Sequence, residues 1–396
     1  MTKRKKKRNG LNRGIEDFID QARKLEEGGN RKQHIVPRSY LSRWSENDQI
    51  RVTETSTPKS FVTSPAKAIR ETDFYRAESP DIDPDMIPPL FFEKALGELE
   101  GRAQPAFEVL ISGDPRDLNP RQALDMGNYL GVQSTRGRSV RTQIQQASNA
   151  ALSFWLDSMP DHQISQMLKS KGTEATPESV ANARIAIDAL SQGKIVASPQ
   201  KPELIARAME MGLKLWPYFL ARRWRVYHTN LDLITCDEPV VMIGGPGSDR
   251  RRVAGHATAR AAIFPLDPHH LLAMFHPDLR LDESVLRPDL DPSELGEINR
   301  EVAANSHKWC MERPTKHQTE SISLPISSKL TTTRTFKVPK SQNDQALELS
   351  RSTRWASSPT PPPWPIRRWW KYVRPDSPDS LPFNPEEMDE VLFNTL

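Results

Sequence analysis

The spacing of apolar residues changes along this chain, and that change limits the fold more than any other feature of the sequence. From residue 90 to about 159 and again from 202 to about 222, apolar residues recur every three or four positions, which is typical of helices that bury one face; residues 160–201 are more polar and show this pattern more weakly. From 223 to 276, short runs rich in Val, Ile and Phe alternate with turns, which is typical of strands. We therefore predict an α+β fold, in which a helical N-terminal half, with a small β-hairpin near 49–65, packs on a β-rich C-terminal half.

One helix is expected to carry polar residues on its apolar face. Asn119 followed by Pro120 is a helix start, with Asn119 as the N-cap, and the pattern predicts one long helix to about Met159. At about 100° per residue, Gln133 and Arg136 lie on the apolar side of this helix. An Arg in that place must be paired, because an uncompensated buried charge costs several kcal/mol.

Other helix boundaries follow from proline and from capping residues. The helical pattern over 90–111 contains Pro105, which predicts a kink or a division there. A capping box at 291–294 predicts a helix from Pro292 to about Ser306. The connection GGPG at 244–247 follows a predicted strand and is interpreted as a turn.

Composition suggests how the chain is divided. The 34 prolines in 396 residues exceed the usual share of about 5%, so part of the chain is expected to be unpacked. We predict a basic disordered arm over 1–14 and a single α+β body over 15–315, which begins with a helix at 15–27 and contains a peripheral insertion at 160–201. Residues 316–396 are predicted to be a Pro/Ser/Thr-rich tail, largely extended or disordered.

Several protein classes are excluded. Two cysteines, Cys236 and Cys310, cannot supply a disulfide framework or a cysteine-rich zinc site. No apolar run approaches the roughly 18 residues that a membrane helix needs. The basic start is not followed by the apolar stretch of a secretory signal. We expect a cytoplasmic protein with no membrane partner.

The positive charge is concentrated at the start of the chain. Seven basic residues and no acid stand within 1–14; without them, the 55 basic residues fall to 48 against 51 acidic residues, a net charge of −3. Such a run attracts polyphosphates and is a candidate nucleic-acid contact, but it is equally the composition of a solvated arm, which we prefer.

The usual short motifs of nucleotide hydrolysis, dinucleotide redox chemistry, zinc proteases, α/β-hydrolases and kinases are missing. A cluster of metal-ligating residue types occurs at His269, His270, His276 and Asp278. If the apolar residues between are a strand, His270 and His276 lie about 20 Å apart. One ion cannot bridge that distance, so we do not predict a metal site there.

In the segment QHIVPRSYLSRW at 33–44, residues recur at spacings of three and four, so we predict a turn set by Pro37 followed by one helical turn. These residues are His34, Pro37, Tyr40, Leu41 and Trp44. Several side chains would then project together. The alternative is a packed entry helix in which His34 only completes a hydrogen-bond network.

Several segments follow one another in the order of a known family. They are QHIVPRSYL, the DFY at 73–75, FEKALGELEGRAQP, VQSTRGRSVR, ITCDEPVV, IFPLDPHHLL and INREVAANSHKW. Over roughly 32–315 the chain resembles the domain-of-unknown-function 4238 family. It departs from the family at 236–239, where Cys-Asp-Glu-Pro replaces Ser-Asp-Asn-Pro, and at 136–138, where Arg-Gly-Arg replaces Arg-Thr-Pro. The resemblance implies extent and position, and no established activity.

The resemblance groups a set of polar candidates, which we expect in one polar pocket. Glu93 and Glu100 are seven apart and so lie on nearly one line of their helix, about 10 Å apart. The set predicted for catalysis is His34, Glu93, Glu100, Gln133, Arg136 and Asp237; the set predicted for substrate binding is Tyr40, Asn299 and Asn305. The alternative is a structural ion-pair network, because such networks also bury charged groups.

These residue types suit the hydrolysis of a phosphodiester or similar ester. His34 would carry the proton, Asp237 or a Glu would be the base or hold a divalent metal, and Arg136 with Gln133 would bind the anionic group. We therefore expect a hydrolase acting on nucleic acid or another anionic phosphodiester or ester substrate. The alternative is a non-catalytic binding or effector module, whose Pro-rich tail recruits a protein partner through PTPPPWP at 359–365.

Overall fold

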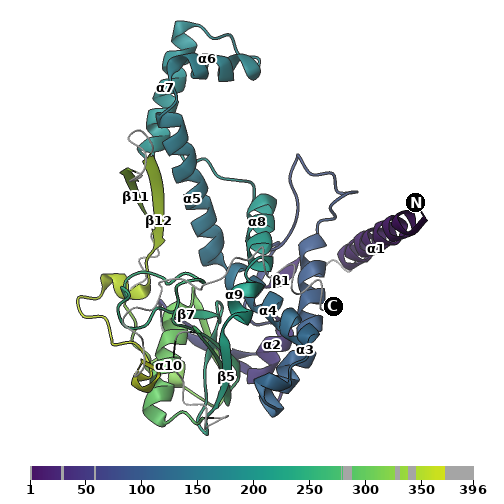
Figure 1. Ribbon diagram of the computed structural model, residues 1–396, viewed down its shortest axis with the longest axis vertical. Coiled ribbons are helices and arrows are strands. Elements are labelled where there is room, and N and C mark those ends of the chain that lie inside the picture. Colours follow the sequence, from purple (N-terminus) through teal and green to yellow (C-terminus); the bar gives the residue numbers. More distant parts are fainter. Residues whose placement is uncertain are drawn as a thin grey trace.

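Two four-stranded antiparallel sheets form the centre of the protein. The computed structural model describes residues 2–27, 31–57, 59–277, 279, 288–325, 331–337 and 345–370. One sheet has the order β5 (Arg223–His228), β9 (His270–Phe275), β8 (Ala261–Asp267) and β7 (Val241–Ile243). The predicted strands at 224–229, 260–267 and 269–275 are β5, β8 and β9, whereas the single strand predicted over LITCDEPVVMI is divided into β7 and a short strand of the second sheet. The α+β fold class is confirmed (Figure 1).

The second sheet contains strands from both the beginning and the end of the body segment. Its order is β3 (Ser60–Thr63), β2 (Ile50–Glu54), β10 (Trp309–Glu312) and β6 (Thr235–Cys236). The predicted hairpin near 49–65 is the pair β2 and β3. In the middle of the sheet, β10 pairs with β2 on one side and with β6 on the other, which places Cys310 opposite Cys236.

A short ribbon leads the chain into the body. It pairs β1 (Lys32–His34) with β4 (Arg70–Thr72) and is followed by α2 (Arg38–Leu41). Tyr40 and Trp44 are buried in the main apolar core, as expected for the packed entry helix.

Helices cover the first sheet from one side. They are α3 (Phe91–Ser112), α4 (Pro120–Thr135), α8 (Lys201–Leu213) and α9 (Trp216–Leu220). Pro105 lies inside α3 without dividing it, so the predicted division is wrong. Proline removes one backbone donor from a helix, and the burial of Ala103, Ala106 and Phe107 around it holds the helix together.

The predicted long helix from Pro120 to about Met159 is also wrong, because two helices replace it. Asn119 caps α4 as predicted, but α4 ends at Thr135 and α5 (Arg138–Asp157) begins after Gly137. Gly137 has extended backbone angles. The carboxylate of Glu238 then accepts a hydrogen bond from the backbone N–H of Ser139 and so occupies the start of the new helix.

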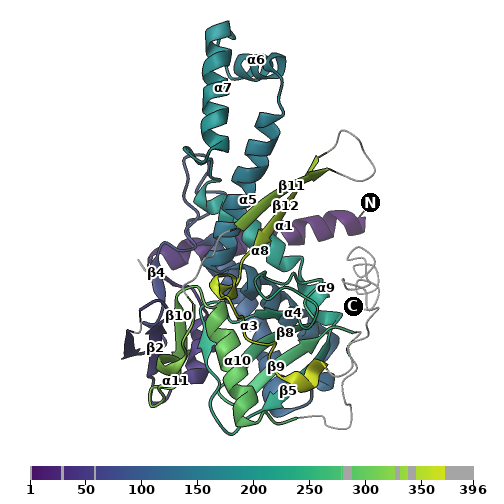
Figure 2. The same cartoon turned by 90° about the vertical axis from the view of Figure 1, so that its left-hand side faces the viewer.

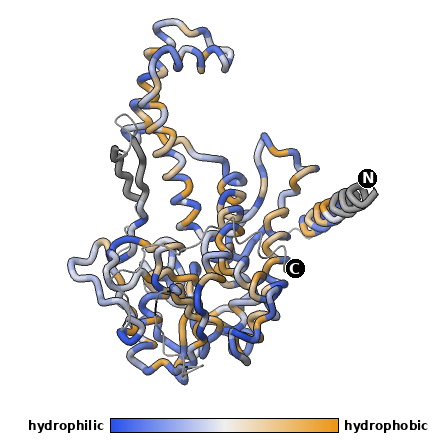
Figure 3. The backbone as a smooth tube through the Cα atoms, viewed as in Figure 1, coloured by the Kyte–Doolittle hydropathy of each residue, from blue (hydrophilic) through white to orange (hydrophobic). Residues whose placement is uncertain are grey.

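A helical arm extends away from the sheets. It consists of α5, α6 (Asp161–Ser170) and α7 (Pro177–Ser191), and it stands above the rest of the protein in Figures 1 and 2. Its α6 and α7 lie in the segment predicted as an insertion at 160–201. Met159, Ile164 and Ile187 form a small apolar cluster there. Hydrophobic and hydrophilic residues alternate along this arm in Figure 3.

The leading helix is longer than predicted. α1 spans Thr2–Glu27, including the basic residues that we assigned to a disordered arm over 1–14. Lys and Arg are good helix formers and no proline interrupts the run, so nothing in the local sequence ends the helix at residue 14. The ring of Phe18 packs edge-on against Phe91 of α3.

The tail is the largest correction. Within 316–396, the structure contains α11 (Gln318–Ser321), β11 (Thr331–Lys337), β12 (Gln345–Arg351) and the 3-10 helices η3 (Arg354–Ser357) and η4 (Arg367–Trp370). We call residues 351–370 the C-terminal strap. It docks on the body, because Trp355, Ile366 and Trp369 are buried there. Residues 371–396 of the predicted tail lie outside the described part of the chain.

The last helix of the body, α10 (Pro292–Asn305), begins with the predicted capping box of Asp291 and Glu294. It buries Leu295, Ile298 and Val302 against the second apolar cluster. Gly245 and Gly247, which follow β7, both have positive φ, as a turn at GGPG requires. Within the described ranges, no helix is long and apolar enough to cross a membrane.

Candidate functional site

Arg136 is the centre of a buried ion-pair and hydrogen-bond network. It is the C-cap of α4 and is 4% exposed. Its Nη1 donates to Oε1 of Glu100 at 2.8 Å, and its Nε donates to the hydroxyl of Tyr75 at 2.8 Å. Its Nη2 donates to the backbone carbonyl of His34 at 3.3 Å. The predicted pairing of this arginine with a carboxylate is therefore present, and the partner is Glu100.

Glu93 lies beside this network, two turns before Glu100 on α3. Burial raises the pKa of Glu93 to about 7, although Arg136 acts to lower it and Glu100 acts to raise it. The structure thus brings Glu93, Glu100 and Arg136 together as expected. A buried carboxyl that titrates near neutral pH can hold or release a proton there.

Gln133 is buried on the same side of α4, one turn before Arg136. Neither its amide nitrogen nor its amide oxygen has a hydrogen-bond partner within the described chain, and the hydroxyl of Tyr129 has none either. Tyr129 interacts electrostatically with Glu100 and Arg136. We call this group of Glu93, Glu100, Tyr129, Gln133 and Arg136 the buried polar centre.

Asp237 is held in a different place. Its carboxylate accepts hydrogen bonds from the backbone N–H groups of His307, Lys308 and Trp309, at 2.7, 2.8 and 3.2 Å. These bonds fix the turn between α10 and β10. The charge of Asp237 is thus balanced by backbone dipoles, and the predicted partnership with Arg136 is not among its contacts.

The ring of His34 points to a third place. Its Nε2 lies 3.1 Å from the backbone carbonyl of Ala66. Burial lowers the pKa of His34 below its ordinary value, although that carbonyl acts in the opposite direction. The structure therefore does not assemble His34, Arg136 and Asp237 into one centre: only the backbone of His34 contacts Arg136. The local spacing in 33–44 gave no information about where the ring would point.

The open pocket of this region lies over Asp237. We call it the Asp237 pocket; its empty space, including the part open to solvent, is about 1150 Å³. It is lined by apolar residues and by both signs of charge: Ile35, Phe61, Lys67, Ile69, Arg70, Glu71, Arg138, Asp237, Glu238, His307, Lys308 and Trp309. His34 and Arg136 do not line it, but their sequence neighbours Ile35 and Arg138 do.

The lining of the Asp237 pocket has four basic and three acidic side chains, and Nζ of Lys308 also lies 3.4 Å from Oε1 of Glu54, outside the lining. Lys67, Arg70, Arg138 and Lys308 contribute four positive charges. Of the acids, Glu71 pairs with Arg138, and Asp237 is bound by three backbone amides. Glu238 accepts from the N–H of Ser139 at 2.8 Å, and its other oxygen lies 3.4 Å from Nη2 of Arg351.

His307 is the imidazole of the pocket. Its Nδ1 lies 3.2 Å from the hydroxyl oxygen of Ser139 in the first turn of α5. This hydrogen bond orients the ring. A serine hydroxyl can donate or accept, and Nε2 carries the basic lone pair when Nδ1 holds the proton and donates it to the hydroxyl. The sequence analysis missed His307, Ser139 and Glu238. The only sequence signal was that all three stand in segments that carry the family resemblance.

The predicted substrate-binding residues have structural contacts. The hydroxyl of Tyr40 donates to the carbonyl of Pro265 at 2.8 Å and lies 2.7 Å from the hydroxyl of Thr235. The amide oxygen of Asn299 accepts from the N–H of Ile234 at 3.0 Å. Tyr40 and Asn299 are 1% and 3% exposed, so neither can meet a substrate in this conformation.

Asn305 lies nearer to the surface, at the end of α10. Its amide nitrogen donates to the backbone carbonyls of Glu238 and Val240, at 2.5 and 3.2 Å. It thereby supports the segment that carries Glu238. Asn305 does not line the Asp237 pocket. It lines a second pocket, which we call the pocket under the strap because strap residues such as Thr353 and Trp355 also line it.

A metal site does not emerge from the described residues, which contain no group of three or more His, Cys, Asp and Glu side chains that could hold an ion. In the histidine cluster, His270 pairs with Asp267 at 2.9 Å and Nδ1 of His269 lies 3.0 Å from the carbonyl of Thr229. Asp278 lies outside the described part of the chain.

Residues 32–316 match the family model described as "Protein of unknown function (DUF4238)". A search of curated proteins and a search of solved structures found no match. The matched segment contains the buried polar centre and the whole Asp237 pocket, and it ends before the C-terminal strap. Since the match covers well over half of its residues, the chain belongs to the DUF4238 family.

Proposed function

We propose that the Asp237 pocket binds a phosphate-bearing anion and that the protein is a hydrolase of a phosphodiester or similar ester in nucleic acid or another anionic substrate. The observation that carries the proposal is the oriented imidazole of His307 in a pocket with four basic side chains. Cationic groups bind and neutralise phosphate oxygens, and an imidazole is the side chain best matched to proton transfer near neutral pH.

In this proposal, His307 is the general base. Its Nε2 takes a proton from a water molecule, whose oxygen attacks the phosphorus or the ester carbon. The bond to the leaving oxygen breaks, and the protonated imidazole returns its proton to that oxygen. Arg138 and Lys308 stabilise the charge that develops on the non-bridging oxygens. Ser139 acts by holding the ring of His307, since Ser139 itself is 5% exposed.

The second candidate is a binding module without turnover. It is favoured by the engagement of both carboxylates, because Asp237 and Glu238 accept hydrogen bonds from backbone amides. It is also favoured by the sealed position of Arg136 and Gln133, which are 4% and 2% exposed. Such a pocket can hold an anion and offer no acid to the leaving group.

A combined activity and binding experiment separates the two candidates. Purified full-length protein would be tested against DNA, RNA and nucleotides, with and without a divalent metal, and inorganic phosphate binding would be measured by calorimetry. For the hydrolase, His307→Gln should lower the rate by about 10²–10⁴-fold and leave phosphate binding within a few-fold. Phosphate binding that is lost in Lys308→Ala, with no turnover of any substrate, would favour the module. Failure of the wild-type protein to bind phosphate would contradict both.

We also propose a cytoplasmic site of action. Cys236 and Cys310 lie directly opposite each other on neighbouring strands and are free thiols. Free thiols in this arrangement are typical of a reducing compartment. Fractionation of cells that express the tagged protein would test the location.

Two partner proposals remain from the sequence. The basic residues within 1–14 are proposed to contact nucleic acid through a salt-sensitive attraction, and deleting them should remove most non-specific binding in a gel-shift assay at low salt. The segment PTPPPWP is proposed to recruit a protein partner. That role requires its release from the body, because the carbonyl of Pro362 accepts a hydrogen bond from Nε of Arg250.

A further inference from the structure

The C-terminal strap lies outside the family match but docks on the matched body. Trp355, Ile366 and Trp369 are 6%, 0% and 3% exposed. The ring of Trp369 packs edge-on against Phe275 of β9, with 4.9 Å between the ring centres. These contacts bury large apolar groups of the strap against the first sheet. The burial of this apolar surface stabilises the docked position of the strap.

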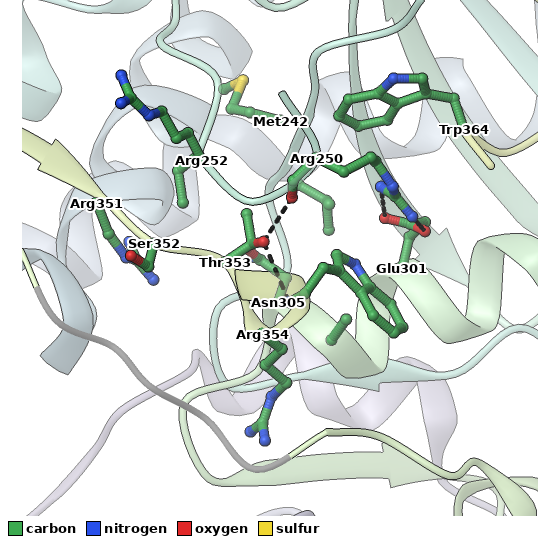
Figure 4. A pocket seen from close by; sticks show the side chains of 14 residues that line it. Met242, Arg250, Arg252, Glu301, Asn305, Arg351, Ser352, Thr353, Arg354 and Trp364 are labelled. Atoms are coloured by element: carbon green, nitrogen blue, oxygen red, sulfur yellow. Dashed lines mark hydrogen bonds and ion pairs between the residues drawn. The ribbon is translucent and has the colours of Figure 1, made fainter. Parts of the chain in front are cut away.

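An ion pair of the body anchors the strap. Arg250 makes two hydrogen bonds to the carboxylate of Glu301 on α10, at 2.9 and 2.5 Å. The guanidinium carbon of Arg250 lies 4.3 Å from the ring centre of Trp364 and 5.5 Å from that of Trp355. In addition, the hydroxyl of Thr353 donates to the carbonyl of Arg250 at 2.6 Å. Figure 4 shows this arrangement, with Arg250 between Glu301 and Trp364.

The first residues of the strap contact Glu238, which lines the Asp237 pocket, and Ser306, which is next to His307 of the lining. Nη2 of Arg351 lies 3.4 Å from Oε2 of Glu238. Nη2 of Arg354 donates to the carbonyl of Ser306 at 3.2 Å, next to His307. The chain of contacts therefore runs from Arg351 to Glu238, from Glu238 to the N–H of Ser139, and from the hydroxyl of Ser139 to His307.

We infer that the strap is part of the functional site and that Arg351 is a positioning residue: it holds the Glu238 carboxylate at the start of α5 and keeps it away from an anion in the Asp237 pocket. The inference rests on the proposed function. When the strap is docked, Glu238 is neutralised and aimed at the N–H of Ser139. When the strap is released, Glu238 loses its pairing with Arg351, so its negative charge acts more strongly on a phosphate at the pocket wall and its carboxylate is held less firmly on the N–H of Ser139.

The test compares two arginines at the contact between the strap and the body, Arg351 and Arg252. Arg351→Gln removes the contact with Glu238. Arg252→Gln is the matched control, because Arg252 pairs with Ser352 through the backbone and lines the pocket under the strap, but does not line the Asp237 pocket. With inorganic phosphate as the ligand and full-length protein, Arg351→Gln should weaken binding about tenfold, and Arg252→Gln should leave it within twofold. Equal losses in both variants would overturn the inference.

A second arm uses Glu238→Gln, which keeps an oxygen for the N–H of Ser139 and removes the charge. If Arg351 acts through Glu238, adding Arg351→Gln to this variant should have no further effect on phosphate binding. The same tenfold loss in both backgrounds would show that Arg351 acts on the anion directly and would overturn the positioning role.

A readout that needs no ligand separates this inference from the proposed function. The imidazole titration of His307 can be followed by NMR, with His307→Gln to assign the signal. A Glu238 carboxylate that has lost its pairing with Arg351 should move the His307 titration to higher pH in Arg351→Gln, and Arg252→Gln should leave the titration unchanged. If the wild-type protein binds no phosphate, the proposed function is wrong; an unmoved His307 titration, in contrast, would refute the strap inference itself.

Discussion

The hydroxyl oxygen of Ser139 lies 3.2 Å from Nδ1 of His307, although 168 positions separate the two residues. One stands in the first turn of α5 and the other in the turn between α10 and β10, where Asp237 holds the backbone. The relationship therefore depends on two carboxylates. Asp237 accepts a hydrogen bond from the backbone N–H of His307, and Glu238 accepts one from the backbone N–H of Ser139.

Gly137 is the position where that relationship can be disturbed most selectively. A Cβ atom at Gly137 would lie 2.6 Å from Oε1 of Glu238, so Gly137→Ala must displace the carboxylate. We expect weaker phosphate binding and a loss of about 1 kcal/mol of stability from the uncapped α5. Gly296→Ala in α10 is the control, because a Cβ there meets nothing within 4 Å, and it should be neutral or stabilising. Calorimetry and urea unfolding measure both effects; equal behaviour of the two variants would contradict the prediction.

Arg136→Ala should be the most destabilising change in the buried polar centre. It leaves the carboxylate of Glu100 without its partner and removes the donor to Tyr75, at an expected cost of about 3–5 kcal/mol. Urea unfolding measures the free energy. Arg116→Ala is the control, since the pair of Arg116 with Asp114 has a 70% exposed arginine side chain and should contribute below about 1 kcal/mol. A loss below 1 kcal/mol at Arg136 would show that the network is dispensable.

Glu93 should make the protein less stable as the pH rises. The pKa of Glu93 is about 7 in the folded protein because of burial, whereas an unfolded chain has about 4.3. Between these values the folded state binds the extra proton, so the free energy of unfolding falls with rising pH, by up to about 4 kcal/mol. Glu93→Gln should remove this slope between pH 5 and 7 in urea unfolding. Glu98→Gln, whose carboxylate is 43% exposed on the same helix, should keep it.

Trp369→Ala should reduce stability, although the residue lies in the segment 316–396 that was predicted from its composition to be a tail. Its ring contacts Tyr227 and Phe275, and the loss of a buried tryptophan costs about 3–5 kcal/mol. Trp155→Ala, at a position that is 55% exposed on the helical arm, should change stability by less than about 1 kcal/mol. Denaturant unfolding of the two variants decides the matter, and indistinguishable midpoints would mean that the strap is not anchored in solution.

Local features of the fold could be predicted from the sequence, because their causes are local. The caps at Asn119 and Asp291 depend on residues three positions apart, and both are present. The hairpin of β2 and β3 and the strands β5, β8 and β9 were also predictable, since alternation and turn residues are adjacent in the chain, whereas the division of 233–243 into β6 and β7 was not. The end of α4 could not be predicted in this way. The group that accepts a hydrogen bond at the start of α5 is the carboxylate of Glu238, which is 99 positions away from Ser139 in the sequence.

The candidate site was predictable only in part, for the same reason. An arginine on an apolar helix face requires a carboxylate, and the nearby pair on α3 supplied it. His34 looked equally suitable, but its ring turns to Ala66, which no spacing rule indicates. His307 was overlooked because its partner Ser139 lies on another helix. The strap was misjudged because a proline-rich composition indicates an extended backbone and says nothing about where tryptophans dock.

The position of β10 in the second sheet sets the order in which this protein can be completed. The hairpin of β2 and β3 emerges from the ribosome early, but a two-stranded hairpin is at best marginally stable in water. Its partner strand, Trp309–Glu312, is synthesised only after the arm, the first sheet and α10. The hairpin must therefore wait for the end of the family segment before it gains its partner strand, and this step of folding is a long-range strand pairing, which is slow compared with helix formation. A chain interrupted before residue 309 would leave the edge of β2 exposed to other chains.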